Sequence, residues 1–458
     1  MPPGRPANPP GPSAMSPLPP DRRRQRVWGL AGVILLLAWA GWWTASLTRP
    51  VPALWPGPPM SEREQATYIL IWPFVGVDFQ HNYAAVNSWL DGHDPYVAIE
   101  NDPINPHYIY PPPTLLAFAW AGLFPPAAVH TLMSIAGPNG LSEFPYCRPA
   151  VFLWMAAIVV ITALAAGQSW RVRGRLRLPP LPLVFVLGAT LISYPVMFEL
   201  ERGNCDVLPL LALALLVVPA LTWRHRLGGD LAIAAGVALA AGIKAYPGIL
   251  LLGLLALRRH RAAAFAAGLL FLQVAAFWHP FAEWFAATRA DAGHSTTLFM
   301  DYSHSPLVHW QLAWTTLGAP ALARLPREAI VDLVVLAAVL AVSGRVFRAR
   351  PDPAVAWPYL LWLTTMGTLV NVTAYDYSLL YLPLAVLAAW DARDSWRVHL
   401  CLLPALFWWF PFSIGLSGLP LLLLKVAGIF LVGVLVLRRL PPSVTAAGPK
   451  AASPAPAA

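Results

Sequence analysis

The sequence is poor in charged residues. Only 12% of its 458 residues are Asp, Glu, Lys or Arg, whereas 57% are hydrophobic, and the mean hydropathy is +0.57. Because charged residues make up about a quarter of a typical soluble domain, this composition excludes an ordinary soluble protein. Apolar runs of roughly 20 residues, the length that crosses a bilayer, recur along the chain. The sequence therefore predicts an all-α polytopic membrane protein.

Cysteine and familiar nucleotide-binding motifs are also scarce. The three cysteines form neither a disulfide framework nor a metal motif. The chain lacks a G-x-G-x-x-G loop after a strand, a Walker motif and a G-x-S-x-G elbow, which leaves cytosolic nucleotide chemistry without a site. The formal net charge is +9, but the basic residues form short clusters between apolar runs and no continuous patch, so we expect no nucleic-acid partner. No metal or cofactor is predicted.

The basic clusters predict the topology, because short loops rich in arginine mark the cytoplasmic side. A Pro-rich segment, 1–26, is predicted to be disordered, and the run 27–47 is the first span, leading outward. Later clusters divide the integral domain, 27–440, into about 12–14 crossing segments. Both termini, including a disordered tail 441–458, are then cytoplasmic. Two long loops, 48–110 and 280–327, face outward and carry short helices.

Two apolar regions do not fit a single span. Residues 112–124 and 126–136 are short apolar pieces hinged at Pro125-Pro126, and we expect them to descend and return. Residues 229–257 lie between two basic clusters and are too long for one span but short for two. A hairpin broken at Lys244-Ala245-Tyr246-Pro247 fits best, either re-entrant or as two short spans.

Suggestive polar groups fall on the predicted outer side. They are Asp78 and His81, the turn 199–206, the stretch 294–309 and Tyr375-Asp376. Asp78 has aromatic neighbours on both sides, where partial desolvation favours a role as a base. The alternative is that it is one solvated acid among seven in its loop.

Lys244 interrupts an apolar hairpin. A lysine at the bilayer centre costs roughly 2.5–3.5 kcal/mol, so a phosphate or carboxylate partner is expected unless the side chain snorkels. The turn at Glu199 to Asn204 either caps helices or contributes to a site. Asp301, His304 and His309 match no metal-ligand spacing, and His304 is better interpreted as a hydrogen-bond donor to substrate.

Five motifs occur in a fixed order, and together they resemble a known family. They are Asp78-Phe79 with Tyr83-Ala84-Ala85, then Gly92-His93-Asp94-Pro95-Tyr96, Tyr110-Pro111-Pro112, Arg202-Gly203-Asn204-Cys205-Asp206, and Gly242-Ile243-Lys244-Ala245-Tyr246-Pro247 followed by Arg258-Arg259. In this order they resemble glycosyltransferase family 87, polyprenol-phosphate-mannose-dependent mannosyltransferases of the GT-C membrane fold. The resemblance covers roughly residues 70–390. The family often has Gly-Gln-x-Asn or Gly-Gln-x-Asp where this chain has Gly203 to Asp206, and residues 137–148 look like an insertion.

The resemblance implies a function and a site. A hexose, most simply mannose, passes with inversion from a polyprenyl-phosphate donor to a lipid or glycan acceptor at the outer face of a membrane, here expected to be the cytoplasmic membrane of a bacterium. Asp78 takes the role of catalytic base. The implied substrate-binding residues are Lys244, Arg202, Asn204, His304, His81, Tyr110, Tyr246 and Asp376.

Two other function classes stay open. A transporter or flippase of an anionic or glycosylated lipid would use the same charges to bind cargo, although its need for access from both faces conflicts with their one-sided placement. A ligase or polymerase that moves an oligosaccharide from a lipid pyrophosphate is the other alternative.

Overall fold

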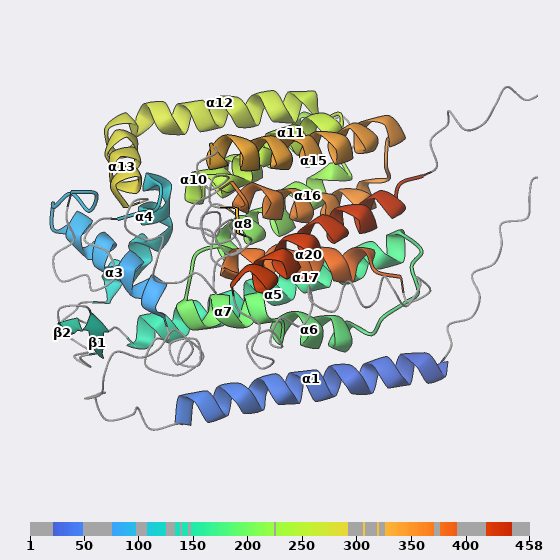
Figure 1. The fold of residues 1–458 in the computed structure, drawn as a ribbon, viewed down its shortest axis with the longest axis horizontal. Coiled ribbons are helices and arrows are strands. Elements are labelled where there is room, and N and C mark those ends of the chain that lie inside the picture. Colours follow the sequence, from blue (N-terminus) through green and yellow to red (C-terminus); the bar gives the residue numbers. More distant parts are fainter. Residues whose placement is uncertain are drawn as a thin grey trace, which may run out of the picture.

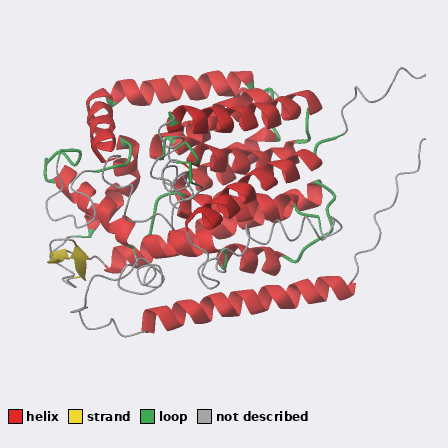
Figure 2. Cartoon of the chain, viewed as in Figure 1, coloured by secondary structure: helices red, strands yellow, loops and turns green. Residues whose placement is uncertain are grey.

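The computed structural model describes residues 22–48, 76–97, 108–124, 133–137, 140–144, 148–223, 226–291, 306, 318–319, 326–370, 376–391 and 418–441. Nearly all of this is helical (Figure 2). The α-helices are α1 Arg22–Thr48, α3 Val77–Leu90, α4 Pro112–Phe118, α5 Arg148–Arg175, α6 Leu183–Leu191, α7 Tyr194–Arg202, α8 Val207–Ala212, α9 Val218–Leu221, α10 Leu227–Ile243, α11 Leu250–Ala256, α12 His260–Ala276, α13 Trp278–Asp291, α15 Arg327–Ala349, α16 Pro353–Thr368, α17 Tyr381–Ala389 and α20 Gly418–Arg438.

Shorter segments complete the described chain. The 3₁₀ helices are η1 Ala119–Leu123, η4 Tyr246–Ile249 and η7 Asp376–Leu380, and the π-helical turn η3 Leu213–Val217 joins α8 to α9. Strands β1 Met133–Gly137 and β2 Gly140–Phe144 form an antiparallel hairpin in which Gly137 pairs with Gly140. The sequence analysis expected residues 126–136 to be an apolar segment that returns through the membrane. Residues 133–136 belong to a strand, so the prediction is wrong there. The Gly-Pro-Asn-Gly sequence at 137–140 is typical of a turn between strands.

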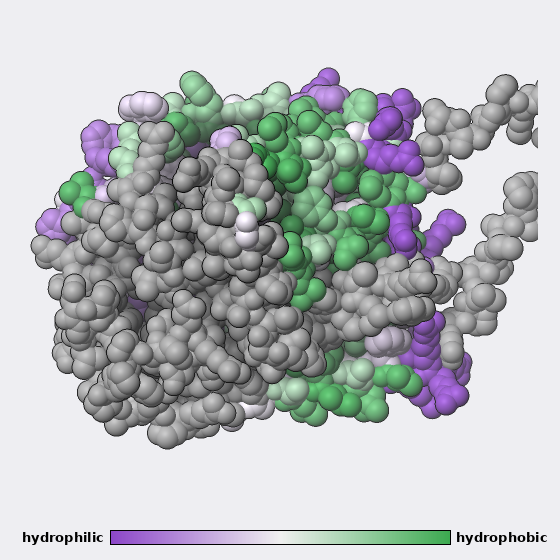
Figure 3. Space-filling model, in the orientation of Figure 1, coloured by the Kyte–Doolittle hydropathy of each residue, from purple (hydrophilic) through white to green (hydrophobic). Residues whose placement is uncertain are grey.

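The elements separate into two ends of the molecule (Figure 1). At one end lie α3, α4, α13 and the hairpin, and at the other end α1 begins and α20 finishes. Figure 3 shows hydrophilic surface gathered at this second end and a hydrophobic band beside it. α1 includes the basic residues from Arg22 to Arg26, so the helix begins inside the segment 1–26 that the sequence analysis assigned to disorder. Residues 1–21 and 442–458 lie outside the described chain.

Within the described residues, two helices are long and apolar enough to cross a membrane, Pro149–Arg175 and Glu328–Ala349. Two bent pairs, α6 with α7 at 58° and α12 with α13 at 89°, raise this number to four if each pair is one span. Large apolar side chains are exposed on several of these helices and on α1, including Leu30, Leu37, Val160, Phe271, Leu272, Leu333 and Leu340. This exterior is compatible with an integral membrane protein.

The predicted number of 12–14 crossings finds no support in the described helices. Several apolar runs form helices of only 10–17 residues, such as Pro112–Leu123, Leu227–Ile243 and Ser378–Ala389. At 1.5 Å per residue these are shorter than the roughly 30 Å hydrocarbon core. Prolines placed at the first turn of α4 and α7 start new helices where the hydropathy alone indicates a continuing run.

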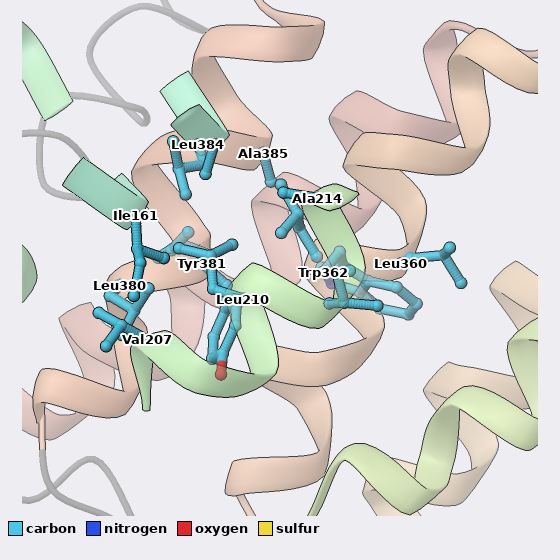
Figure 4. Packing of buried hydrophobic residues seen from close by; sticks show 14 of the residues in the cluster. Ile161, Val207, Leu210, Ala214, Leu360, Trp362, Leu380, Tyr381, Leu384 and Ala385 are labelled. Atoms are coloured by element: carbon cyan, nitrogen blue, oxygen red, sulfur yellow. The ribbon is translucent and has the colours of Figure 1, made fainter. Parts of the chain in front are cut away.

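The core is built around a helical pair that is buried on all sides. Every residue from Ala354 to Thr368 in α16 and from Tyr381 to Ala389 in α17 is buried. α17 packs on α16 and α5, and Figure 4 shows Tyr381, Leu384 and Ala385 among Ile161, Val207, Leu210 and Ala214 from neighbouring helices. This packing fixes the position of η7, which precedes α17 and contacts α7 beside the polar site.

Candidate active site

Asp78 lies in the first turn of α3, a short helix within the segment 48–110 that the sequence predicted to be an outer loop carrying short helices. Gly76 precedes the helix with φ of 78°, and its N–H donates to the Glu201 carbonyl at 2.5 Å. The start of a helix favours a negative charge, because unpaired N–H groups and the helix dipole point there. The Asp78 side chain is buried, with 7% relative exposure.

Two donors hold the Asp78 carboxylate, one on each oxygen. The Arg202 guanidinium lies 3.0 Å from Oδ1, and the Asn204 amide donates to Oδ2 at 2.6 Å. The second Asn204 amide hydrogen goes to the Tyr110 hydroxyl at 3.1 Å, while Asn204 Oδ1 accepts from the Cys205 N–H at 2.7 Å. This network fixes the amide orientation with its donors toward Asp78.

A close approach of two glycines brings these groups together. Gly203 ends α7 in the left-handed conformation, with φ of 65°. A Cβ at Gly203 would lie 3.0 Å from Cβ of Phe79 and 3.1 Å from Cα of Gly76. Only a residue without a side chain fits both the backbone conformation and this distance. The glycine of the Arg202-Gly203-Asn204 motif therefore lets its two polar neighbours reach Asp78.

Lys244 lies at the break between α10 and η4, as the sequence predicted. Its backbone is extended, with φ of −135° and ψ of 133°. The ammonium lies 4.2 Å from the centroid of the Tyr110 ring and 3.4 Å from Asp206 Oδ1. The side chain is only 12% exposed. Lys244 therefore does not snorkel to water, and the expected anionic partner is a carboxylate of the same chain.

Asp206 is a site residue to which the sequence analysis assigned no role. Its side chain is fully buried, and besides Lys244 it accepts from the Tyr246 hydroxyl at 2.8 Å and the Ser378 hydroxyl at 2.6 Å. The Tyr381 hydroxyl donates to the Asp206 carbonyl at 2.8 Å and lies 3.0 Å from the Tyr246 hydroxyl. Asp206 is the last residue of the Arg202-Gly203-Asn204-Cys205-Asp206 motif, and that position could have indicated a role in the site. Nothing in the apolar run that contains Tyr381 indicated a polar contact.

Buried tyrosine side chains pack beside the two ion pairs of the site, Asp78 with Arg202 and Lys244 with Asp206. Burial, and secondly the charge of Asp78, raises the pKa of Tyr110 well above its usual value, so its hydroxyl keeps its proton. Burial likewise raises the pKa of Tyr108, whose hydroxyl donates to Asn82 Oδ1 at 2.7 Å. His81 packs against both rings, with centroids 5.3 Å from Tyr108 and 5.9 Å from Tyr110.

The structure brings together most of the predicted site residues. Asp78, Arg202, Asn204, Tyr110, Lys244 and Tyr246 form one continuous cluster, and His81 packs at its edge. Asp376 opens η7, two residues before Ser378, but its side chain is not among those described. His304, together with Asp301 and His309, lies outside the described residues.

The turn after α7 both caps a helix and serves the site. Glu199 Oε1 accepts the Val207 N–H at the start of α8 at 3.2 Å, which is a capping role. Three and five residues later, Arg202 and Asn204 reach Asp78. The two interpretations of this turn therefore apply to different residues.

The cluster combines the Asp78 carboxylate and the Lys244 ammonium group, and contacts within the chain fix the position of each. Each Asp78 oxygen accepts from one of the two donors described, and a carboxylate oxygen has lone pairs for a further hydroxyl donor. The Lys244 ammonium lies over the ring of Tyr110. In the described part of the chain, no three His, Cys, Asp or Glu side chains form a group that would hold a metal ion. Searches for related proteins give no match to a family model and no significant match to a curated protein or a solved structure.

Proposed function

We propose that the chain is a membrane glycosyltransferase of the GT-C type, which transfers a hexose, most simply mannose, from a polyprenyl-phosphate donor to a hydroxyl of a lipid or glycan acceptor at the outer face of the membrane. The observation that carries the proposal is that Asn204 donates to both Asp78 and the Tyr110 hydroxyl, while the Lys244 ammonium lies over the Tyr110 ring. The order of the five motifs supports the family resemblance.

The proposed reaction assigns separate roles to the two charges. Asp78 removes the proton from the acceptor hydroxyl as that oxygen forms a bond to the anomeric carbon on the face opposite the phosphate. The bond from the anomeric carbon to the phosphate oxygen breaks, and the lipid phosphate leaves with the electron pair. Inversion follows from this single displacement. The growing negative charge on the phosphate is stabilised by Lys244, so no general acid is needed.

The buried geometry supports a chemical role over simple cargo binding. Arg202 and Asn204 fix the Asp78 carboxylate within one network, and α3, α7 and the Tyr110 segment form that network from distant parts of the chain. A catalytic group needs this kind of fixed orientation. A transporter or flippase instead needs a site that opens in turn to both faces.

The test compares Asp78→Asn with Asp91→Asn in protein reconstituted into liposomes. Asp91 lies at the end of the same helix and is exposed, so it controls for loss of one negative charge. With labelled polyprenyl phosphate mannose and a membrane extract as acceptor, Asp78→Asn is expected to lower transfer by about 10²–10⁴-fold. Asp91→Asn is expected to retain it.

Three results would count against the proposal. Undiminished transfer by Asp78→Asn removes the base assignment. Movement of labelled lipid across the liposome bilayer, without sugar transfer by the wild-type protein, favours the flippase. Release of a whole oligosaccharide from a lipid pyrophosphate favours the ligase or polymerase.

A further inference from the structure

A second site lies beside the candidate active site. A cavity of about 390 Å³, open to the surface on one side, is lined by the end of α3 and the segment after it, the start of α4 and the junction between α12 and α13. This volume lies within the range that holds a small molecule. All five residues of the Gly92-His93-Asp94-Pro95-Tyr96 motif, to which the proposed reaction gives no role, line the cavity.

The polar groups of this cavity carry negative charge. Two carboxyl side chains, Asp94 and Glu283, line the cavity. His279 Nδ1 lies 2.9 Å from Glu283 Oε1, and Asp94 Oδ1 accepts the Tyr96 N–H at 2.8 Å. Neither lysine nor arginine occurs among the described residues that line the cavity. An anionic ligand such as a lipid phosphate is therefore disfavoured here, in contrast to the region around Lys244.

Aromatic surface complements these carboxyl groups. Trp89, which is 40% exposed, and the buried Tyr96 both line the cavity. A flat apolar ring beside paired hydrogen-bonding groups is the combination that suits a saccharide, because a sugar ring has C–H faces and a rim of hydroxyl groups. An uncharged sugar satisfies the donors and acceptors of Asp94, Glu283 and the histidines without bringing a buried charge.

One side chain connects the cavity to the catalytic cluster. Tyr96 lines the cavity, and its hydroxyl donates to the Tyr110 carbonyl at 3.1 Å. The Tyr110 hydroxyl in turn contacts Asn204, which holds Asp78. Pro112, two residues after Tyr110, also lines the cavity. A ligand in the cavity therefore lies next to the segment that forms the wall of the proposed active site.

We propose that this cavity binds an uncharged saccharide, and, resting on the proposed function, that the saccharide is a sugar unit of the acceptor glycan. Binding of a saccharide in the cavity does not depend on the proposed function. The acceptor role assigns the two substrates to chemically different places: the anionic donor to the cationic side of Tyr110, and the neutral acceptor to the acidic cavity.

Binding is tested without catalysis. Saturation-transfer NMR is recorded on the full-length protein in detergent micelles with methyl α-mannoside and an α-linked mannobiose. Asp94→Asn and Glu283→Gln are expected to weaken saccharide binding at least tenfold, and Asp91→Asn, which removes the same charge from an exposed position outside the cavity, is expected to leave it unchanged. Undecaprenyl phosphate is added as the anionic probe and is expected not to displace the saccharide.

The outcomes separate the two proposals. Saccharide binding that is unaffected by both Asp94→Asn and Glu283→Gln, or that is displaced by undecaprenyl phosphate, overturns the cavity assignment. In the transfer assay, the two variants are expected to raise the acceptor KM at least tenfold with little change in kcat, whereas Asp78→Asn lowers kcat. Transfer with a normal acceptor KM in both variants rejects the cavity while the proposed function stands. Asp94-dependent binding in a protein that transfers no sugar supports the cavity and rejects the proposed function.

Discussion

Asn204 donates a 2.6 Å hydrogen bond to Asp78, although 126 residues separate the two in the chain. Removing this donor in Asn204→Ala is expected to lower kcat for sugar transfer by about tenfold to a hundredfold. A hydrogen bond to a charged group contributes about 1.5–3 kcal/mol, and each 1.4 kcal/mol is a factor of about ten. Asn87→Ala is the matched control, since the Asn87 amide only donates to the Tyr83 carbonyl one turn earlier on the same helix. Equal rates for the two variants would contradict a positioning role for Asn204.

The buried pair of Lys244 and Asp206 predicts different effects on stability and on transfer. Lys244→Met leaves the Asp206 carboxylate without its cation, which costs about 3–5 kcal/mol in comparable buried pairs. The double variant Lys244→Met/Asp206→Asn removes both charges and is expected to regain most of the thermal stability in micelles. Transfer is expected to stay low in the double variant, because the leaving phosphate still lacks the lysine. Wild-type transfer by a stable double variant would limit Lys244 to a structural role.

Gly203 offers a test of the close approach between α3 and α7. Gly203→Ala places a Cβ 3.0 Å from Phe79 in a left-handed conformation, and is expected to reduce transfer at least tenfold by moving Asn204 away from Asp78. Gly318→Ala introduces the same left-handed strain, of about 1–2 kcal/mol, at φ of 70° with no atom within 4 Å of the new Cβ. Similar transfer by the two variants would show that contact with Phe79 does not matter.

The packing of α1 on α6 depends on Gly32. A Cβ at this position would lie 2.5 Å from the Phe185 nitrogen and 2.6 Å from the Val184 carbonyl carbon, both backbone atoms. Gly32→Ala is expected to destabilise the protein by about 1–3 kcal/mol, the usual cost of overpacking. Gly41→Ala, on the same helix with open space around it, is expected to be neutral or stabilising. Thermal unfolding in micelles measures both, and equal shifts would place α1 away from α6.

The predicted topology is best tested at exposed positions, because Asp78 itself is buried and a cysteine there would escape labelling. Asp91 and Gly174 are both exposed. The substitutions Asp91→Cys and Gly174→Cys are made singly in a variant that lacks the native cysteines. An impermeant maleimide is expected to label position 91 in intact cells, and position 174 only after permeabilisation. The reverse pattern would place the candidate site in the cytoplasm.

The sequence predicted which residues meet better than it predicted how they pair. Counting basic clusters placed Asp78 and the turn at Arg202 and Asn204 on one face, and it indicated a hairpin broken at Lys244 that was either re-entrant or two short spans. The structure brings these three segments together. Charge alone left open which acid pairs with which base. The structure joins Arg202 to Asp78 and Lys244 to Asp206, and a count of charges along the chain does not contain the close approach of Gly203 to Gly76.

Helix breaks were easier to predict than membrane crossings. The chain does restart at Pro112 and does break at Lys244, because proline and a lone lysine mark these places directly. Hydropathy cannot separate a helix buried in protein from one that faces lipid, since both are apolar all round. α16 and α17 show this: their residues are as apolar as a span, and yet protein surrounds them.

The contacts of Asp206 also set an order of events during synthesis. Its hydroxyl partners Ser378 and Tyr381 follow it by 172 and 175 residues. At a translation rate of about 5–20 residues per second, roughly 10–35 seconds pass before these two hydroxyl donors, Ser378 to the carboxylate and Tyr381 to the backbone carbonyl, are made. Truncated products that end before Ser378 keep only the Lys244 and Tyr246 contacts of the carboxylate. Completion of the last third of the protein is therefore also the event that closes the polar site.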